Sequence, residues 1–493
     1  MPKPAGQMAR NTAGNEIGGN DMPQLLKPDI CVIGGGSGGL AAAMAAAACG
    51  VPVTLVEKGA LGGRRLSAGL PALALFGAAR RVFVPPFGHA VQSDIEAAVH
   101  DMARNVSKER LTGLGVQVIE GTARFADGAT VVVGDACRIK ARRFIIATGS
   151  RPAPPPIPGL DGVPYLTETS VFGLRDCPQH LLVLGADAAG LEFADAFRRF
   201  GAEVSVLDST EPLAGEDPEC AAVLLTQLAR RGIAVRGGLT IERVGQAGAN
   251  IQVTVAGAGG AETIEGSHLL IAGQRQADLD ALDLDAASIA YEPAGIIVNR
   301  GLKSSNKRVY AIGGAARLPN DRRQHSPRAA TRGSHVAAHH GGLAVRNALF
   351  RWPARLHAVA LPRVVRTEPE LAHVGLTESA ARRQGHKINV LRWPYRENDR
   401  ARLERRTDGH IKVVTGRWGR ILGATIVGAE ASELIAAWTL AVAQRLSIRA
   451  MAGLAPPQGS FAEIGKDAAV TYLSAGLTSS WVGRLLAWLR RLG

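Results

Sequence analysis

The chain has 493 residues, of which 46% are apolar and 20% charged, and its 57 Lys and Arg against 43 Asp and Glu give a formal net charge of +14. At roughly 150 residues per domain, this length predicts about three domains, and the apolar content excludes a disordered chain. No apolar run reaches the roughly 18 residues of a membrane span, and the polar N-terminal residues contain no secretory signal, so we predict a cytoplasmic protein.

Neither nucleic acid nor a metal ion is an expected ligand. Aromatic residues make up only 4% of the chain, which disfavours a stacking surface for nucleic acid. The adjacent His339 and His340 point about 100° apart on a helix and cannot readily chelate one ion. Five scattered cysteines form no C-x-x-C pair and are expected to be mostly buried thiols in a reducing compartment: Cys31, Cys49, Cys137, Cys177 and Cys220.

A dinucleotide-binding unit is predicted after a flexible tail over residues 1–27. A short apolar strand over 29–33 is followed by a glycine-rich turn, an Ala-rich helix over 40–49 and a second apolar strand over 51–56 that ends on Glu57. This order of strand, turn, helix and strand is typical of the first half of a doubly wound sheet.

The glycines of this turn have the G-x-G-x-x-G spacing. Gly34 permits the tight turn, Gly36 lets a pyrophosphate approach the backbone, and Gly39 allows the helix to pack closely on the strand. Glu57 ends the second strand, where a carboxylate can accept both ribose hydroxyls. The spacing alone also fits a simple glycine-rich loop, but its flanking elements and the acid favour dinucleotide binding.

A second unit of the same kind follows over residues 181–208. It keeps Gly185 and Gly190 but has Asp187 in place of the middle glycine, and its second strand ends on Asp208, which favours NAD over NADP. A carboxylate about 4 Å from a diphosphate costs roughly 1 to 4 kcal/mol, so dinucleotide binding is expected to be weakened or lost. Alternatively, Asp187 caps the helix that begins near it.

Two further segments follow from the pattern of prolines and strands. The Pro-rich stretch 151–158 is predicted to be a linker between the two nucleotide units. From Pro362 onward, strands over 411–414 and 421–427 and an apolar helix over 432–446 predict a third, α+β domain.

Taken together, several motifs resemble one known family. Besides the two nucleotide units, they are Ala147-Thr-Gly-Ser-Arg-Pro152, Tyr310-Ala-Ile-Gly313 and the segment 367–378. In combination they resemble the pyridine nucleotide-disulfide oxidoreductases, most of all the branch of dihydrolipoamide dehydrogenase and mercuric reductase, over about residues 28–478.

This resemblance implies an α/β fold with two doubly wound dinucleotide-binding domains, the second inserted in the first, and a C-terminal α+β dimerisation domain. It implies FAD bound by residues 28–158 and 286–350, NAD(P)H bound by residues 159–285, and a homodimer formed through residues 355–478. The residues that the resemblance adds to the cofactor-binding set are Gly63, Thr148, Gly149, Arg275 and Gly313.

The sequence departs from the family where the redox disulfide is expected. In the family, the segment Gly-Gly-Thr-Cys-x4-Cys is followed shortly by a lysine near the flavin. Here Arg65 and Leu70 stand near the two cysteine positions, and Leu73 replaces the lysine. Because neither Arg65 nor Leu70 can supply a thiolate, dithiol exchange is excluded at this place.

Other departures affect residues that touch cofactor or substrate in the family. The Asp of a Gly-Asp pair that bonds FAD is replaced by Gly314 after Gly313, and Gln458 stands where a His serves as acid-base residue. Glu463 and Glu192 are retained, although Glu192 has lost its lysine partner.

We therefore expect an FAD-dependent oxidoreductase without the catalytic disulfide, which transfers electrons from NAD(P)H through flavin to an acceptor that is not a thiol. FAD binding is expected to be weakened, and NAD(P)H binding is doubtful because of Asp187. The alternative is a catalytically inactive pseudoenzyme that acts as a scaffold or binds a partner.

Residues 479–493 are predicted to form an amphipathic helix. Trp481, Leu485, Trp488, Leu489 and Leu492 fall along one stripe, and the arginines at 484, 490 and 491 lie off it. Such a helix can lie on an anionic membrane surface. Because the stripe is only three turns long, packing on its own protein is the preferred interpretation.

Overall fold

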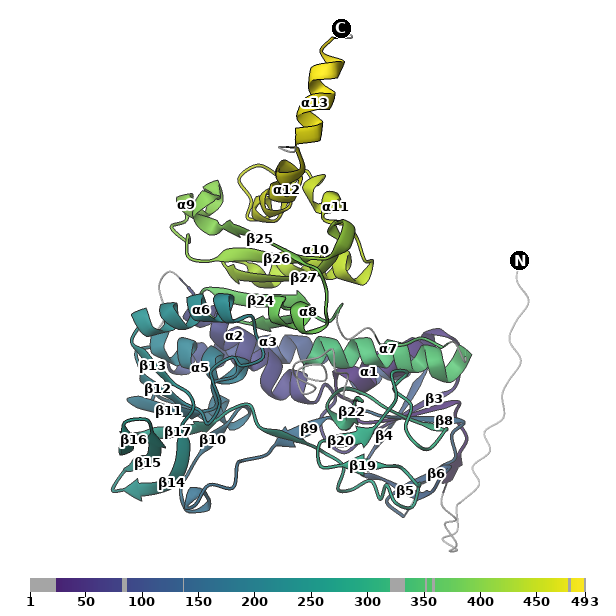
Figure 1. Cartoon of the computed structure of the whole chain (residues 1–493). Coiled ribbons are helices and arrows are strands. Elements are labelled where there is room, and N and C mark those ends of the chain that lie inside the picture. Colours follow the sequence, from purple (N-terminus) through teal and green to yellow (C-terminus); the bar gives the residue numbers. More distant parts are fainter. Residues whose placement is uncertain are drawn as a thin grey trace, which may run out of the picture.

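The computed structural model describes residues 24–81, 87–135, 137–319, 333–350, 353–356, 360–477 and 480–491. Two lobes, each built on a five-stranded sheet, lie side by side, and a third domain sits above them (Figure 1). This arrangement confirms the predicted α/β fold.

The first lobe contains a parallel sheet of order β21-β8-β2-β3-β4. Its central strand β2 is fully buried, as expected for a parallel sheet covered on both faces. Its strands are β2 (Ile30–Ile33), β3 (Val53–Glu57), β4 (Val116–Glu120), β8 (Arg143–Ile146) and β21 (Val309–Ala311). Its helices are α1 (Ser37–Ala48), α4 (Lys108–Gly113) and α7 (Ser334–Phe350). A π-helix, η1 (Arg65–Gly69), leads into α2 (Leu70–Ala79) and α3 (His89–Arg104), whose buried side chains join the core of the second lobe.

Smaller sheets complete this lobe. They consist of β1 (Gln24–Leu26), β5 (Ala123–Asp127), β6 (Thr130–Val133) and β7 (Cys137–Ile139), and of β19 (Tyr291–Glu292), β20 (Gly295–Ile297) and β22 (Ala316–Arg317). The predicted tail extends too far, because residues 24–26 form β1, which pairs in parallel with β7. Residues 1–23 of that tail lie outside the described residues.

The second lobe repeats the parallel design with the order β10-β17-β11-β12-β13. Because it lies between β8 and β21 in the chain, it is inserted in the first lobe, as predicted. Its elements are β10 (Leu166–Thr167), β11 (His180–Leu184), α5 (Ala188–Arg199), β12 (Glu203–Leu207), α6 (Pro218–Arg230), β13 (Ile233–Arg236), β14 (Thr240–Ala247), β15 (Asn250–Gly257), β16 (Gly260–Gly266) and β17 (His268–Ile271).

The two connections between the lobes run side by side. The predicted linker 151–158 begins within β9 (Ser150–Pro152), and β9 pairs antiparallel with β18 (Arg275–Ala277) on the return path. The linker is therefore held at its start by backbone hydrogen bonds.

The third domain is an antiparallel sheet of order β23-β24-β27-β26-β25 with helices packed on it. The apolar helix predicted over 432–446 ends earlier, at Ala443, because Arg445 adopts a left-handed conformation with φ 57°. The elements are β23 (Arg363–Val365), β24 (Glu370–Gly375), α8 (Glu378–Arg383), β25 (Asn389–Pro394), α9 (Asp399–Leu403), β26 (His410–Thr415), β27 (Ile421–Gly428), α10 (Ala431–Ala443), α11 (Ile448–Ala452) and α12 (Glu463–Leu477).

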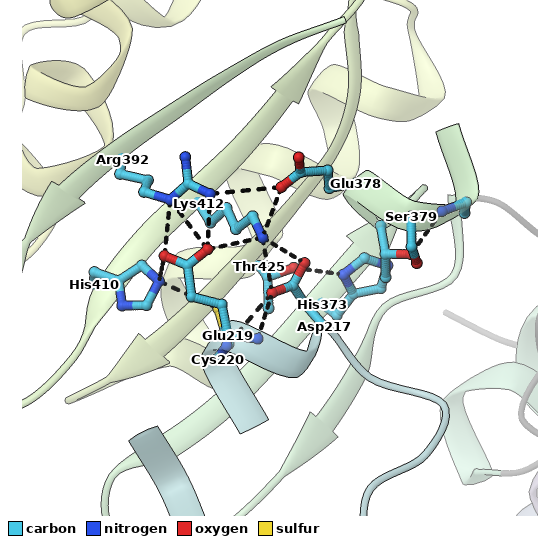
Figure 2. A network of polar contacts seen from close by, with 12 residues as sticks. Asp217, Glu219, Cys220, His373, Glu378, Ser379, Arg392, His410, Lys412 and Thr425 are labelled. Carbon is cyan, nitrogen blue, oxygen red and sulfur yellow. Dashed lines mark hydrogen bonds and ion pairs between the residues drawn. The ribbon is translucent and has the colours of Figure 1, made fainter. Parts of the chain in front are cut away.

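A buried ionic cluster joins the second lobe to this sheet (Figure 2). Lys412 on β26 is 4% exposed in its side chain and contacts Asp217 Oδ2 at 3.0 Å, Glu219 Oε2 at 2.9 Å and Glu378 Oε2 at 3.1 Å. Burial opposes the charge of Lys412, but these hydrogen bonds raise its pKa above the ordinary value. The cluster fixes the start of α6 against β26.

The last described helix, α13 (Ser480–Leu489), projects from the third domain beyond α12 (Figure 1). Of the predicted stripe, Trp488 and Leu489 are exposed, and so is the neighbouring Leu486, so the described part of this chain does not cover them. The side chains of Trp481 and Leu485, and all of Leu492, lie outside the described residues. Among the described residues, no helix is both long and apolar enough to cross a membrane.

Candidate functional site

The glycine turn of the first lobe is tightly constrained. Gly34 has φ 104°, and a Cβ there would lie 2.5 Å from the Ala147 carbonyl oxygen. A Cβ on Gly39 would overlap the Gly34 carbonyl oxygen. Both positions therefore require glycine, one for its backbone conformation and both for close approach.

The second lobe repeats this geometry. Gly185 has φ 119°, and a Cβ there would lie 2.5 Å from the Ala272 carbonyl oxygen. A Cβ on Gly190 would overlap the Gly185 carbonyl oxygen. The turn before α5 is thus built like the turn before α1.

The acid that ends the second strand of each unit is held by its glycine turn. Glu57 accepts hydrogen bonds from the backbone N–H of Gly35 and, at 2.8 Å, of Gly59. Asp208 accepts one from the N–H of Ala186 at 2.6 Å. Each carboxylate is therefore positioned beside a turn where a ribose would lie in a dinucleotide fold.

The two turns differ at their middle residue. Gly36 has φ −75° and ψ −175°, no side chain caps α1, and a Cβ on Gly36 would meet nothing within 4 Å. Asp187 has φ −83° and ψ −176°, and its Oδ1 accepts hydrogen bonds from Ala189 N at 3.1 Å and Gly190 N at 3.3 Å. The first helix N-terminus is open to an anion, whereas Asp187 already fills the second.

Loops after β8 and β21 border the first turn. Thr148 has a buried Oγ1 that makes no hydrogen bond within the described part of the chain, and the following Gly149 has φ 77°. Gly313 has φ 58° and donates its N–H to His340 Nδ1 at 3.2 Å, while His340 Nε2 has no hydrogen-bond partner among the described residues. Burial, with a contribution from the neighbouring His339, lowers the pKa of His340 to about 4. Two unsatisfied buried polar atoms beside an open helix N-terminus fit a bound polar group.

The residue after Gly313 has no acidic side chain. A Cβ on Gly314 would lie 2.9 Å from Ser150 Oγ, so the serine occupies the direction in which a side chain would extend. Ser150 Oγ in turn accepts a hydrogen bond from Arg275 Nε at 3.0 Å.

The segment predicted to replace the redox disulfide begins against the first turn. Gly62 N donates to Gly35 O at 2.8 Å, and a Cβ on Gly63 would lie 3.1 Å from Gly36 Cα. Arg65, which starts η1, is exposed. Leu70 starts α2 and is partly buried, and Leu73 is 43% exposed.

A buried carboxylate that sequence reasoning missed lies between the lobes. Glu168 is 5% exposed and contacts Arg64 and, at 3.1 Å, Arg275. It also accepts a hydrogen bond from Gly273 N at 3.3 Å. Although burial opposes its charge, the two arginines hold the pKa of Glu168 below its usual range. No local pattern could reveal it, because its arginine partners are more than a hundred residues away in sequence.

Glu192 lies on α5 without a lysine partner among the described residues. Its Oε1 accepts a hydrogen bond from Arg366 N at 2.7 Å. Burial raises the pKa of Glu192 to about 7, against the opposing effect of Arg366. This carboxyl group is therefore partly protonated at neutral pH.

Gln458 and Glu463 are not brought to the glycine turns within one chain. Gln458 is exposed, and Glu463 is the first residue of α12 in the third domain. Figure 1 shows α12 on the side of the third domain that faces away from α1.

The cysteines form no redox pair. All five are free, and burial raises the pKa of Cys31, Cys137 and Cys220 above the ordinary value. Such thiols are poor nucleophiles. Within the described part of the chain, no group of three or more His, Cys, Asp or Glu side chains could hold a metal ion.

Comparison with known proteins extends these observations to nearly the whole chain. The pyridine nucleotide-disulfide oxidoreductase family matches residues 28–340, and the dimerisation domain of the same family matches residues 361–469. The chain is 32% identical to a mercuric reductase of Streptomyces lividans, with 90% of this chain and 96% of that protein covered. It is 30% identical to dihydrolipoyl dehydrogenase 3 of Pseudomonas aeruginosa, with 90% and 97% covered.

Solved structures share the fold. LpdA from Mycobacterium tuberculosis superposes with a TM-score of 0.80 at 24% identity, covering 91% of this chain and 99% of that one. The HOCl-induced flavoprotein disulfide reductase RclA from Escherichia coli gives 0.78 at 24% identity, covering 90% and 99%.

Proposed function

Because the chain belongs to the pyridine nucleotide-disulfide oxidoreductase family, we propose that it is an FAD-dependent oxidoreductase that works without a redox-active disulfide and passes electrons to an acceptor that is not a thiol. The observation that carries the second part is the absence of any cysteine between Cys49 and Cys137. The segment around Arg65 and Leu70, which begins against the first glycine turn, contains no thiol to take electrons.

The residues of the first lobe fit the phosphate and ribose end of FAD. The uncapped N-terminus of α1 suits a pyrophosphate, and the absence of a Cβ on Gly36 leaves room for it. Glu57 is placed to bind the ribose, and the unsatisfied Thr148 Oγ1 offers one more polar contact. When bound, FAD would supply a two-electron carrier.

The residues at the other end of the expected cofactor fit less well. Gly314 offers no carboxylate, and Leu73 offers no ammonium group. Loss of one charge-assisted hydrogen bond costs roughly 1.5 to 3 kcal/mol, or about one to two powers of ten in affinity. FAD is therefore expected to bind more weakly than in relatives that keep these groups.

A second candidate is a catalytically inactive scaffold, and Asp187 favours it. Its carboxylate takes the N–H groups of Ala189 and Gly190 that a pyridine nucleotide would need in the second lobe. Without a nucleotide there, reduction of a flavin by NAD(P)H would be slow. We propose that either form is a homodimer through the third domain, because that domain matches the dimerisation domain of the family.

The visible spectrum of the purified full-length chain, before and after addition of excess FAD, separates the two candidates. The oxidoreductase proposal expects a yellow protein, or one that FAD stabilises against heat. A chain that stays colourless and shows no thermal shift at millimolar FAD would contradict the oxidoreductase proposal and favour the inactive scaffold.

Turnover assays with different electron acceptors test separately whether the chain works without a redox-active disulfide. With NADH or NADPH as donor, we expect no reduction of lipoamide, oxidised glutathione or mercuric ion, and measurable reduction of a quinone. Steady formation of dihydrolipoamide by clean protein would contradict the placement of the redox segment at Arg65 and Leu70.

A further inference from the structure

Helix α13 exposes apolar side chains that no other described segment of the chain covers. Leu486, Trp488 and Leu489 are 51%, 57% and 45% exposed. The helical register continues past Leu489, because Arg490 N donates to Leu486 O at 3.0 Å. Exposed large apolar residues grouped on one short helix are uncommon in a water-soluble chain.

These side chains are segregated from the charged ones. At about 100° per residue, the three apolar side chains fall within an arc of about 160° of the helix circumference. Arg484, Arg490 and Arg491, all exposed, fall within the remaining arc and span about 120° of it. The helix therefore has one apolar face and one cationic face.

The charge of this region has a single sign. Residues 468–493 contain three arginines and no Asp or Glu. A second copy of α13 laid against the first would bring arginines near arginines without a compensating acid. An anionic surface complements the helix instead.

The dimensions favour a helix that lies on a bilayer. Ten residues at 1.5 Å per residue extend for about 15 Å, which is half of the roughly 30 Å hydrocarbon core. We propose that α13 binds the surface of an anionic membrane, with Leu486, Trp488 and Leu489 inserted at the headgroup level and the three arginines against the lipid phosphates.

Sedimentation of the full-length chain with lipid vesicles tests this proposal. Vesicles of phosphatidylcholine mixed with an equal amount of phosphatidylglycerol should bind the protein, and vesicles of phosphatidylcholine alone should bind it weakly. Binding to the mixed vesicles should fall as salt is added, because salt screens exposed charges. Equal binding to both kinds of vesicle would overturn the proposal.

Variants separate α13 from the general positive charge of the chain. Replacing Arg484, Arg490 and Arg491 by Gln should weaken binding about 100-fold, since each arginine near an anionic surface contributes about fivefold. The matched control replaces three exposed arginines that have no ion pair with a described residue: Arg138, Arg175 and Arg449. This control should change binding less than threefold, and an equal loss in both variants would show that net charge alone drives binding.

The apolar face has its own pair of variants. Trp488→Glu with Leu489→Glu should abolish vesicle binding, whereas Leu403→Glu, at a leucine that is 80% exposed on α9, should not affect it. Light scattering on the same proteins reports their mass. If the double variant halves the mass while vesicle binding persists, a second copy of the chain covers α13 and the membrane proposal is wrong.

Discussion

Gly36 and Asp187 occupy the same place in two equivalent turns, with φ of −75° and −83° and ψ of −175° and −176°. Only Asp187 caps the helix that follows it. Because φ is ordinary at both positions, Asp187 causes no backbone strain. Its effect on ligand binding comes from its carboxylate, which occupies two N–H groups and adds a negative charge where a phosphate would lie.

Replacing Asp187 by Gly should therefore open the second lobe to NADH. We expect binding to tighten by about 1 to 3 kcal/mol, or roughly 5- to 150-fold, measured by calorimetric titration. The lost cap should lower the free energy of unfolding by only a few tenths of a kcal/mol, because glycine is itself tolerated at this position.

Asp187→Asn is the matched control for that experiment. The amide keeps an oxygen that can accept the same two hydrogen bonds but removes the charge, so NADH binding should tighten less than in Asp187→Gly. If the unmodified chain already binds NADH in the low micromolar range, Asp187 does not block the site.

The reverse exchange, Gly36→Asp, should weaken FAD binding without unfolding the protein. The backbone at Gly36 already has the dihedral angles seen at Asp187, and an added Cβ would meet nothing within 4 Å. The melting temperature without FAD should stay the same or rise slightly, while FAD affinity should fall at least tenfold. Gly162→Asp adds the same side chain where a Cβ also meets nothing within 4 Å, and FAD binding should not change there.

An acid introduced at residue 314 should raise FAD affinity only when a second residue is also replaced. In Gly314→Asp the new Cβ would lie 2.9 Å from Ser150 Oγ, so the single variant is expected to gain little FAD affinity. Adding Ser150→Gly removes that oxygen and should raise FAD affinity about 10-fold over the single variant, measured by titration. A single variant that binds FAD as tightly as the double would show that Ser150 moves aside at no cost.

Local patterns predicted the parts of the fold that depend on local geometry. The sequence predicts the turns at Gly34 and Gly185, the strand that ends on Glu57 and the strand that ends directly before Asp208, because glycine conformation and strand period are set by neighbouring residues. The side chain of Asp187 was ambiguous between capping and repulsion, and its hydrogen bonds show that it caps α5.

Contacts between distant segments could not be predicted. Strand β1 forms only because β7 pairs with it, so its residues were mistaken for a tail. Glu168 is 104 residues from Arg64, and Lys412 is 195 residues from Asp217. Ion pairs of this kind carry no period or spacing in the sequence, and they become visible only when the fold brings both partners together.

Glu192 should make stability depend on pH. Burial raises its pKa in the folded chain to about 7, from an ordinary value of 4.5. Its contribution to stability is complete below about pH 4.5 and is lost as the pH rises through about 7, because the folded state holds the proton more tightly than the unfolded state. As the pH rises from about 5 to about 8, the free energy of unfolding of Glu192→Gln should therefore increase by roughly 1 to 3 kcal/mol relative to that of the unmodified chain. The exposed Glu203→Gln should show no such trend in thermal unfolding.

Lys412 should be the most costly single residue to remove from the cluster in Figure 2. Lys412→Met leaves Asp217, whose side chain is 1% exposed, without its cation, and breaking a buried pair in this way typically costs about 3 to 5 kcal/mol. Lys140→Met, at an exposed position, controls for the loss of one charge. It should lower the free energy of unfolding by less than about 0.5 kcal/mol.

The pH dependence of the same variant distinguishes an electrostatic cause from loss of packing. Arg392 and Lys412 hold the pKa of Glu219 at about 2, against an ordinary value of 4.5. The unmodified chain therefore has this stabilisation in full above about pH 4.5 and loses it as the pH falls through about 2. In Lys412→Met, Glu219 keeps Arg392 but loses Lys412, so less of this stabilisation is present to be lost as the pH falls. The difference in melting temperature between the two proteins should therefore shrink from neutral pH to about pH 3. A difference that stays constant over this range would mean that Lys412 stabilises the interface through its packing alone.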